Sequence, residues 1–422
     1  MALRSPNVNA SPWLIPLLYA LGAIILGYSV PRIANDLQPH LVTTITVNVA
    51  VGIYSAIASG MIALTGIVFS LTFVMVQFSA TAYSPRLVLW IARDPVISHS
   101  IGVFTATFLY SLAALAWVDR GGSGKVPLAG AVIVDVLLIA SVIMFVSLIQ
   151  RIGLLQVNRM LVFTGDQGRK TIETFYLPLG ASGSLTATGL AELGCIQTFL
   201  YHGPPRIVQT LDIPYLVELS NKAGCVIESV TSVGDSVFDG IAIFRVLGAI
   251  TTIPERKLRA AIQLGGERTF EQDPKYAIRL LVDIAIRALS PAVNDPTTAV
   301  QALDQIEDLL IRLGRRRLEI GSFCDADGNL RLVTAVPSWE DFLRLSFDEI
   351  RLYGATSIQV MRRMKALVTE LISVLPEARR SAVRIWQERL RSSVERSFAD
   401  QYDKSDASTE DRQGLGVARR PM

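Results

Sequence analysis

Half of the 422 residues are hydrophobic and only 18% are charged, whereas a soluble protein of this length usually carries about 25% charged residues. The net charge of +3 is too small to indicate nucleic-acid binding. Apolar residues crowd into the first 160 positions, which predicts a transmembrane domain over 1–160 followed by a water-soluble domain. The three cysteines are odd in number and far apart, and indicate reduced thiols in a cytoplasmic domain rather than a disulfide framework.

Four apolar stretches predict four transmembrane helices, at about 13–30, 49–78, 101–118 and 128–149. A helix needs about 20 apolar residues to cross a bilayer, so the first and third stretches are near the minimum length. The second would form about 45 Å of helix against a hydrocarbon core of about 30 Å, and we expect it to tilt or to project beyond the bilayer. Basic residues after the fourth stretch predict a multi-pass membrane protein with both termini in the cytoplasm.

The second predicted span carries a stripe of small and weakly polar residues on one helical face. Its members recur at spacings of three, four and seven, and they are Gly52, Ala56, Ser59, Ala63, Gly66, Ser70 and Gln77. In a membrane, small residues let another helix backbone approach closely. Two interpretations stay open, namely ordinary packing inside a four-helix bundle and a subunit interface or pore lining in a homo-oligomer.

The fourth predicted span contains an acidic residue, Asp135, about two turns from its start. A carboxylate inside a membrane costs a few kcal/mol on insertion scales, which makes Asp135 a functional candidate. The alternative is that Asp135 lies near the outer end of the span and reaches water or Lys125.

After the membrane domain, the sequence pattern of residues 161–253 predicts a small mixed α/β subdomain. The segment 206–212 alternates as a strand, and a short helix over 213–224 ends at Gly224. Two further strands flank a glycine-bounded turn at 234–240.

Residues 254–400 predict a mainly helical cytoplasmic subdomain, followed by a polar, disordered tail over 401–422. One helix is expected over 254–265, and the next over 273–290 with Asp273 as its N-cap. On that second helix three charged residues lie four apart and predict an ion-pair ladder, formed by Arg279, Asp283 and Arg287. A hairpin is expected at 318–336, with Gly328 in the positive-φ position of its turn.

The segment "ALSPAVNDPTTAV" (288–300) combines two prolines with capping residues. Ser290-Pro291 predicts the end of one helix, and Asp295 followed by Pro296 predicts the start of the next. Asn294, Asp295 and Thr297 carry the oxygens that would be needed to bind a cation, but no second acidic cluster stands at ligand spacing. We therefore favour a rigid corner, with a ligand-binding loop as the alternative.

Three segments together resemble one family. They are "YSPRL" at 83–87, the block from "QDPKYAIRLL" through "SPAVNDPTTAV" to "DQIEDLL", and "LVELSNKAGCVIESVTSVGDSVFDG". They resemble the bacterial integral membrane family called domain of unknown function 2254. The resemblance implies several N-terminal spans followed by a cytoplasmic domain, and it implies no chemistry.

The predicted fold class is thus a membrane α-helical domain joined to an α+β cytoplasmic domain. We expect a homo-oligomeric channel or transport-like protein with a cytoplasmic regulatory domain, or alternatively a non-conducting scaffold or sensor that docks a cytoplasmic partner. The three histidines are scattered and show no triad or ligand spacing, so we expect no enzyme, metal or cofactor. The expected partners are the lipid bilayer, further copies of the chain, and ions or small solutes, but not nucleic acid.

Overall fold

The computed structural model describes residues 14–37, 43, 45–82, 95–118, 126–152, 157–179, 193–248 and 251–416. The chain divides into two compact units, 1–156 and 157–422. Unit 1 contains four described helices, which are α1 (Leu14–Leu37), α2 (Val47–Ala82), α4 (Pro95–Trp117) and α5 (Leu128–Ile152). Three of them, α2, α4 and α5, are long and apolar enough to cross a membrane. The apolar part of α1 is shorter, Leu14–Val30, so the first predicted span, and with it the count of four spans, stays a prediction.

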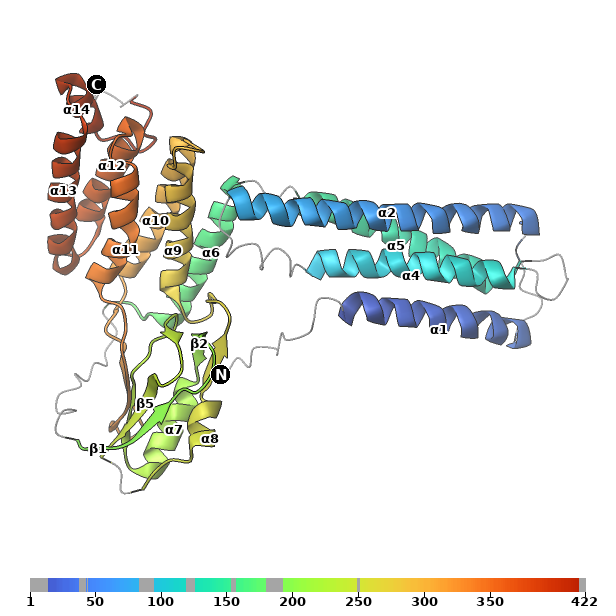
Figure 1. Ribbon diagram of the computed structural model, residues 1–422, viewed down its shortest axis with the longest axis horizontal. Helices are drawn as coiled ribbons and strands as arrows, with labels where there is room; N and C mark the ends of the chain where they lie inside the picture. The colour runs from blue at the N-terminus through green and yellow to red at the C-terminus, as the bar shows by residue number, and fades with distance from the viewer. Residues whose placement is uncertain are drawn as a thin grey trace. The chain divides into compact units, whose positions relative to one another are not determined.

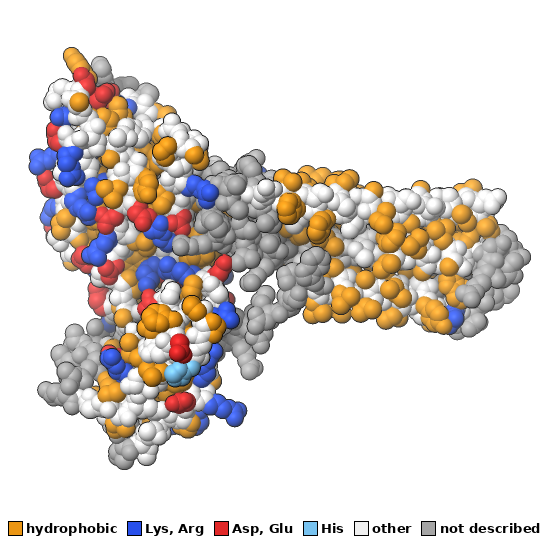
Figure 2. Space-filling model, in the orientation of Figure 1, with side chains coloured by type: hydrophobic (Ala, Val, Ile, Leu, Met, Phe, Trp, Pro, Cys, Tyr) orange, Lys and Arg blue, Asp and Glu red, His pale blue; other side chains and the backbone are white. Residues whose placement is uncertain are grey.

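Helix α4 lies at the centre of unit 1 and packs against α1, α2 and α5. Half of the residues in its apolar segment are buried, against 17% for α2 and for α5. The interior also holds hydroxyl groups, since Thr107 on α4 lies 2.9 Å from Ser141 on α5. Hydrophobic side chains cover much of the visible outer surface of these helices (Figure 2). Helices that are apolar all round are typical of membrane spans.

Unit 2 contains two small β-sheets. The strands are β1 (Cys195–Leu200), β2 (Arg206–Leu211), β3 (Val226–Ser229), β4 (Ser236–Val237), β5 (Ala242–Leu247), β6 (Ile262–Gly265), β7 (Ser322–Cys324) and β8 (Leu330–Thr334). One sheet has the order β1-β5-β3-β8-β7 and the other β4-β2-β6. All neighbours are antiparallel except β3 and β8, which are parallel.

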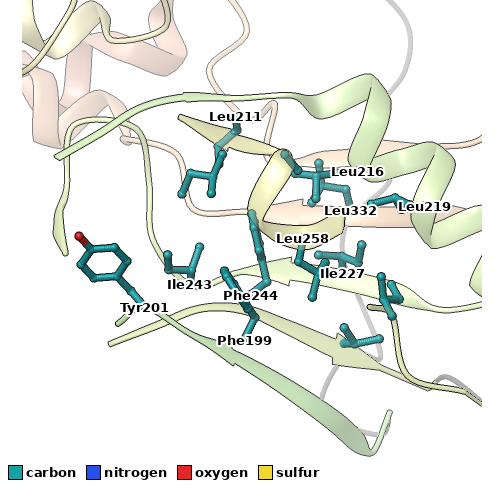
Figure 3. Packing of buried hydrophobic residues seen from close by; sticks show 14 of the residues in the cluster. Phe199, Tyr201, Leu211, Leu216, Leu219, Ile227, Ile243, Phe244, Leu258 and Leu332 are labelled. Atoms are coloured by element: carbon teal, nitrogen blue, oxygen red, sulfur yellow. The ribbon is translucent and has the colours of Figure 1, made fainter. Parts of the chain in front are cut away.

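A shared hydrophobic core joins these strands to α7 (Ile213–Ala223) and α8 (Glu255–Ala260). Phe199 of β1 stacks on Phe244 of β5, with ring centroids 6.2 Å apart. Leu216 of α7 and Leu332 of β8 enter the same core and are fully buried (Figure 3). As predicted, α7 ends at Gly224, which has a φ of 61° and satisfies the helix end through its own N–H.

The prediction of one helix over 254–265 is wrong for the second half of that segment. Helix α8 ends at Ala260, and 262–265 instead form β6, in which Leu264 pairs with Val208 of β2. An apolar run of this length does not distinguish a strand from a helix end, and the partner strand lies about 50 residues away in sequence.

The predicted hairpin is present, and Gly328 has the expected positive φ of 84°. Its place in the fold differs from the prediction, because β8 pairs with β3 and the hairpin completes the larger sheet. The subdomain predicted over 161–253 is therefore finished by residues from the predicted helical subdomain. Local sequence pattern contains no signal for such long-range strand pairing.

The remaining helices of unit 2 form a bundle, in which α9 to α13 run side by side (Figure 1). They are α6 (Val157–Phe175), α9 (Pro274–Ala288), α10 (Pro296–Gly314), α11 (Trp339–Tyr353), α12 (Ile358–Val374) and α13 (Glu377–Ser397). Helix α9 is covered by α6, α10 and α11 of the same chain, which explains why it is apolar on both sides of its charged residues. Helix α11 begins with a capping box between Ser338 and Asp341.

The tail predicted to be disordered over 401–422 is ordered in its first part. Residues 401–407 form α14 (Gln401–Ala407), and Lys404 lies 3.0 Å from Glu395 of α13. The Thr369 hydroxyl of α12 donates a 2.9 Å hydrogen bond to Glu410. Polar composition alone predicts disorder, but here the charged residues find partners on α12 and α13. Residues 417–422 lie outside the described part of the chain.

Candidate functional site

All seven residues of the predicted stripe on α2 are exposed in unit 1. The buried residues of α2 lie on the opposite side of the helix, at about 100° of rotation per residue, and face α4; they are Ala50, Tyr54, Ala58, Met61 and Val68. A Cβ atom added at Gly52 or Gly66 would meet nothing within 4 Å. Packing among the described helices of this chain therefore leaves the stripe uncovered.

Large apolar side chains flank the stripe on the same exposed surface, among them Ile62, Ile67 and Phe69, each more than half exposed. The hydroxyls of Thr65 and Thr72 do not join it, because each donates a 2.7 Å hydrogen bond to a carbonyl one turn earlier. The exposed hydroxyl groups of the stripe are those of Ser59 and Ser70. The result is a narrow band of small residues between bulky apolar ones.

Asp135 lies on the exposed surface of α5, not in the interior of unit 1. Its carboxylate is close enough to Tyr54 of α2 for an electrostatic interaction. Lys125, the alternative partner considered from sequence, lies outside the described residues. The acid is therefore available to whatever covers this surface.

Sequence reasoning missed two buried tyrosines, Tyr54 of α2 and Tyr110 of α4. They line a small hollow with Trp117 and Val126. The Tyr110 hydroxyl is buried and has no hydrogen-bond partner among the described residues. Single aromatic residues inside long apolar runs give no distinguishing signal, so only the packing of α2 on α4 brings them together.

The segment 290–297 forms the predicted corner. Asp295 caps α10 and accepts hydrogen bonds from the Thr298 backbone N–H at 3.1 Å and the Thr298 hydroxyl at 2.6 Å. Asn294 has a φ of 48°, a left-handed conformation that asparagine tolerates better than most residues. The Thr297 hydroxyl accepts a 3.4 Å hydrogen bond from Gln359. These structural roles favour the corner over a ligand loop.

The charged residues of α9 hold helices together. Arg279 donates a 2.7 Å hydrogen bond to Asp283 and forms a 2.6 Å ion pair with Glu349 of α11. Arg287 lies one further turn along α9, at the other end of the predicted ladder, and is half-buried.

Asp273 precedes α9 but does not cap it with its side chain. Its carboxylate is 1% exposed and accepts a 2.7 Å hydrogen bond from Arg268. Burial raises the pKa of Asp273 above its usual range, although Arg268 opposes that rise. Within the described residues no group of three or more His, Cys, Asp or Glu side chains is arranged to hold a metal ion.

The comparisons with known proteins agree with the membrane character of unit 1. The model of a family described as predicted membrane protein (DUF2254) matches residues 9–370. The chain belongs to this family. Of the segments that carried the resemblance, 83–87 lies outside the described residues.

Three mycobacterial proteins match over nearly the whole chain. An uncharacterised protein of Mycobacterium bovis and one of Mycobacterium tuberculosis H37Rv are each 27% identical over 98% of this chain and 82% of their own length. An uncharacterised protein of Mycobacterium tuberculosis CDC 1551 is 26% identical over the same shares. No solved structure matches.

Proposed function

We propose that this protein is a homo-oligomeric channel or transport-like protein, in which the α2 stripes of neighbouring copies face one another along the path. The observation that carries the proposal is the exposure of all seven stripe residues on the side of α2 away from α4. Unit 2 would then lie in the cytoplasm and regulate the path.

The chemistry of the stripe supports a protein neighbour more than lipid. Between membrane helices there is no hydrophobic driving force, and close backbone approach at small residues is a main source of association. Gly52 and Gly66 leave open space where such an approach fits. Ser59 and Ser70 are exposed hydroxyl groups, and such groups are more favourable against another helix than against acyl chains.

Asp135 adds a second group on the exposed surface of unit 1. A carboxylate in a membrane usually faces a bundle interior or a water-filled cavity, because exposure to acyl chains is costly. In an oligomer, Asp135 would meet another copy or the path, where it would attract cations.

The remaining expectations belong to the same proposal. The protein would be located in the bacterial inner membrane with both termini in the cytoplasm, which the basic residues after α5 support. It would act without a cofactor, would not be an enzyme and would bind no nucleic acid. Its partners would be the bilayer, further copies of the chain, and ions or small solutes.

The test is ion flux from liposomes that hold the purified full-length protein, measured for cations and anions under a salt gradient. Gly66→Leu, which adds bulk to the stripe, should reduce flux while the oligomer stays intact. Gly60→Leu is the matched control, because Gly60 is also exposed with open space around it but lies beside the stripe. Its flux should equal that of the wild type.

Two results would contradict the proposal. Absence of flux for every ion and voltage would favour the non-conducting scaffold or sensor that docks a cytoplasmic partner. Flux that neither glycine substitution changes would show that the path does not follow the stripe.

A further inference from the structure

The chain enters the helical bundle of unit 2 at the start of α6, and other helices of the bundle begin or end beside this point. Arg169 of α6 bonds to Asp308 of α10 at 2.8 Å, and Glu173 bonds to Arg312 at 2.6 Å. Both pairs are 139 residues apart, so α6 and α10 run parallel and the first residue of α6, Val157, is level with the first residue of α10.

The start of α12 lies at the same end, because Gln359 bonds to Thr297. We call this end of the bundle the corner end. It comprises the first turns of α6, α10 and α12 together with the connections 289–295 and 354–357. Helix α11 also finishes there, since it leads into α12.

The corner end is tethered to a candidate membrane helix by a short segment. Only residues 153–156 separate the end of α5 from the start of α6. The corner end therefore belongs to the part of unit 2 that follows α5 directly in the chain.

Three arginines gather near the last turns of α11 and α13. We call Arg351, Arg389 and Arg396 the arginine cluster. Arg351 is 8% exposed, donates a 2.8 Å hydrogen bond to Ser393, and lies 3.9 Å from Asp348. Its Nε has no hydrogen-bond partner among the described residues.

The positive charge of the cluster is incompletely balanced. Asp348 is engaged by Arg389 at 2.7 Å, and Glu395, which precedes Arg396 in the chain, is engaged by Lys404 at 3.0 Å. Arg396 is exposed and forms no ion pair within the described part of the chain. Burial, together with the charges of Arg389 and Arg396, lowers the pKa of Arg351, so the arginines act on one another.

Exposed apolar side chains adjoin the cluster at the end of α11. Leu352 is 62% and Tyr353 is 57% exposed, and we call these two residues the apolar rim. Val293, in the corner itself, is 51% exposed. Apolar and tyrosine side chains next to arginines suit the boundary between headgroups and acyl chains.

We propose that the corner end of unit 2 binds anionic phospholipid headgroups through the arginine cluster, with the apolar rim at the acyl-chain boundary. A phosphodiester carries the negative charge that the cluster lacks, and its oxygens accept charge-assisted hydrogen bonds from guanidinium groups. The proposal does not depend on conduction or on the oligomeric state, so it can fail or succeed independently of the proposed function.

The test is hydrogen exchange of the full-length protein in nanodiscs that contain increasing fractions of phosphatidylglycerol in phosphatidylcholine. Peptides that cover 350–358 and 389–397 should become protected as the anionic fraction rises. Each arginine near an anionic surface contributes about fivefold to binding, so Arg396→Gln should weaken the interaction about fivefold and shift the protection to higher anionic fractions. Arg391→Gln is the matched control, because Arg391 is 74% exposed on the opposite side of α13 and should leave the titration unchanged.

Arg389→Gln is a second variant, with a melting measurement to verify that α13 stays folded, since Arg389 also stacks on Trp386 at 4.1 Å. Inorganic phosphate added to phosphatidylcholine nanodiscs forms a separate arm and should give no protection. Equal protection in both lipids, protection by free phosphate alone, or an equal effect of Arg391→Gln and Arg396→Gln would overturn the proposal.

Discussion

Helix α2 of unit 1 and helix α9 of unit 2 are both rich in apolar residues, but they are buried to very different extents. Ten of the fifteen residues of α9 are buried against helices of the same chain, whereas 17% of the apolar segment of α2 is buried. The charged residues of α9 mark one side of that helix, while α2 is apolar all round apart from its small-residue stripe. Periodicity, more than hydrophobicity, therefore indicates whether a helix finds its partners within its own chain.

The two units also place polar groups differently. In unit 1 the Thr107 and Ser141 hydroxyls meet in the interior, while apolar side chains face outward. In unit 2 most ion pairs are at least partly exposed, as that of Arg312 with Glu173 is, although Arg363 of α12 is buried where it pairs with Asp304 and Glu307. This contrast predicts that removing a buried contact lowers stability more in unit 2 than removing the hydroxyl contact does in unit 1.

The largest expected effect is on the core of unit 2. Phe342 of α11 is fully buried, so Phe342→Ala should lower the free energy of unfolding of unit 2 by about 3–5 kcal/mol through lost contacts and a cavity. Urea unfolding of the detergent-solubilised protein, followed by tryptophan fluorescence, would measure the change. The control Ile385→Ala, at a side chain that is 61% exposed, should change it by no more than about 0.5 kcal/mol.

The next effect concerns the buried arginine of α12. Arg363 is 3% exposed and pairs with Asp304 and Glu307, so Arg363→Leu would leave Glu307 nearly buried without its partner. We expect a loss of about 3 kcal/mol in the same unfolding experiment. Arg391→Leu, which removes an exposed pair with Glu388, should cost less than about 1 kcal/mol. Equal losses would show that Arg363 does not act as a buried ion pair.

A smaller effect is expected in the interior of unit 1. The contact between the Thr107 and Ser141 hydroxyls should contribute about 0.6 kcal/mol of coupling, the average for hydrogen bonds between membrane helices. A double-mutant cycle with Thr107→Val and Ser141→Ala, read by detergent-induced unfolding, would isolate it. A coupling of several kcal/mol would contradict the view that this interior relies mainly on helix packing.

The smallest expected effect is a pH dependence in the hairpin of unit 2. The hydrogen bond from Arg331, together with those from Asn329, holds the pKa of Asp325 at about 2, below the usual value of about 3.9. A carboxyl group whose pKa is depressed in the folded state stabilises that state at pH values above its unfolded-state pKa. This stabilisation is lost as the pH falls toward the folded-state pKa. The stability difference between wild type and Asp325→Asn should therefore shrink between about pH 4 and pH 2. A difference that stays constant over this range would mean that Asp325 has an ordinary pKa.

Locally encoded features were predictable from sequence. Gly224, Gly328 and Asp295 each sit at the predicted turn or cap, because their conformations depend on neighbouring residues. Features that depend on distant partners were not predictable. The pairing of β6 with β2 and of β8 with β3 has no local signal.

The candidate sites show the same division. The stripe on α2 was found from spacing, but which side of α2 packs on α4 could not be predicted from a helix that is apolar all round. The arginine cluster joins residues about 40 positions apart on two helices, so only the fold brings it together.

The central claim, that the α2 stripe faces other copies of the chain, can be tested most directly by cysteine cross-linking in membranes. Single cysteines would be placed at Ser59→Cys, Ala63→Cys and Gly66→Cys, and at Gly60→Cys beside the stripe, after the three native cysteines are replaced. We predict rapid oxidative cross-linking of two copies at the three stripe positions and little at Gly60→Cys. Cross-linking at Gly60→Cys that is as fast as at the stripe, or its absence at all three stripe positions, would contradict the claim.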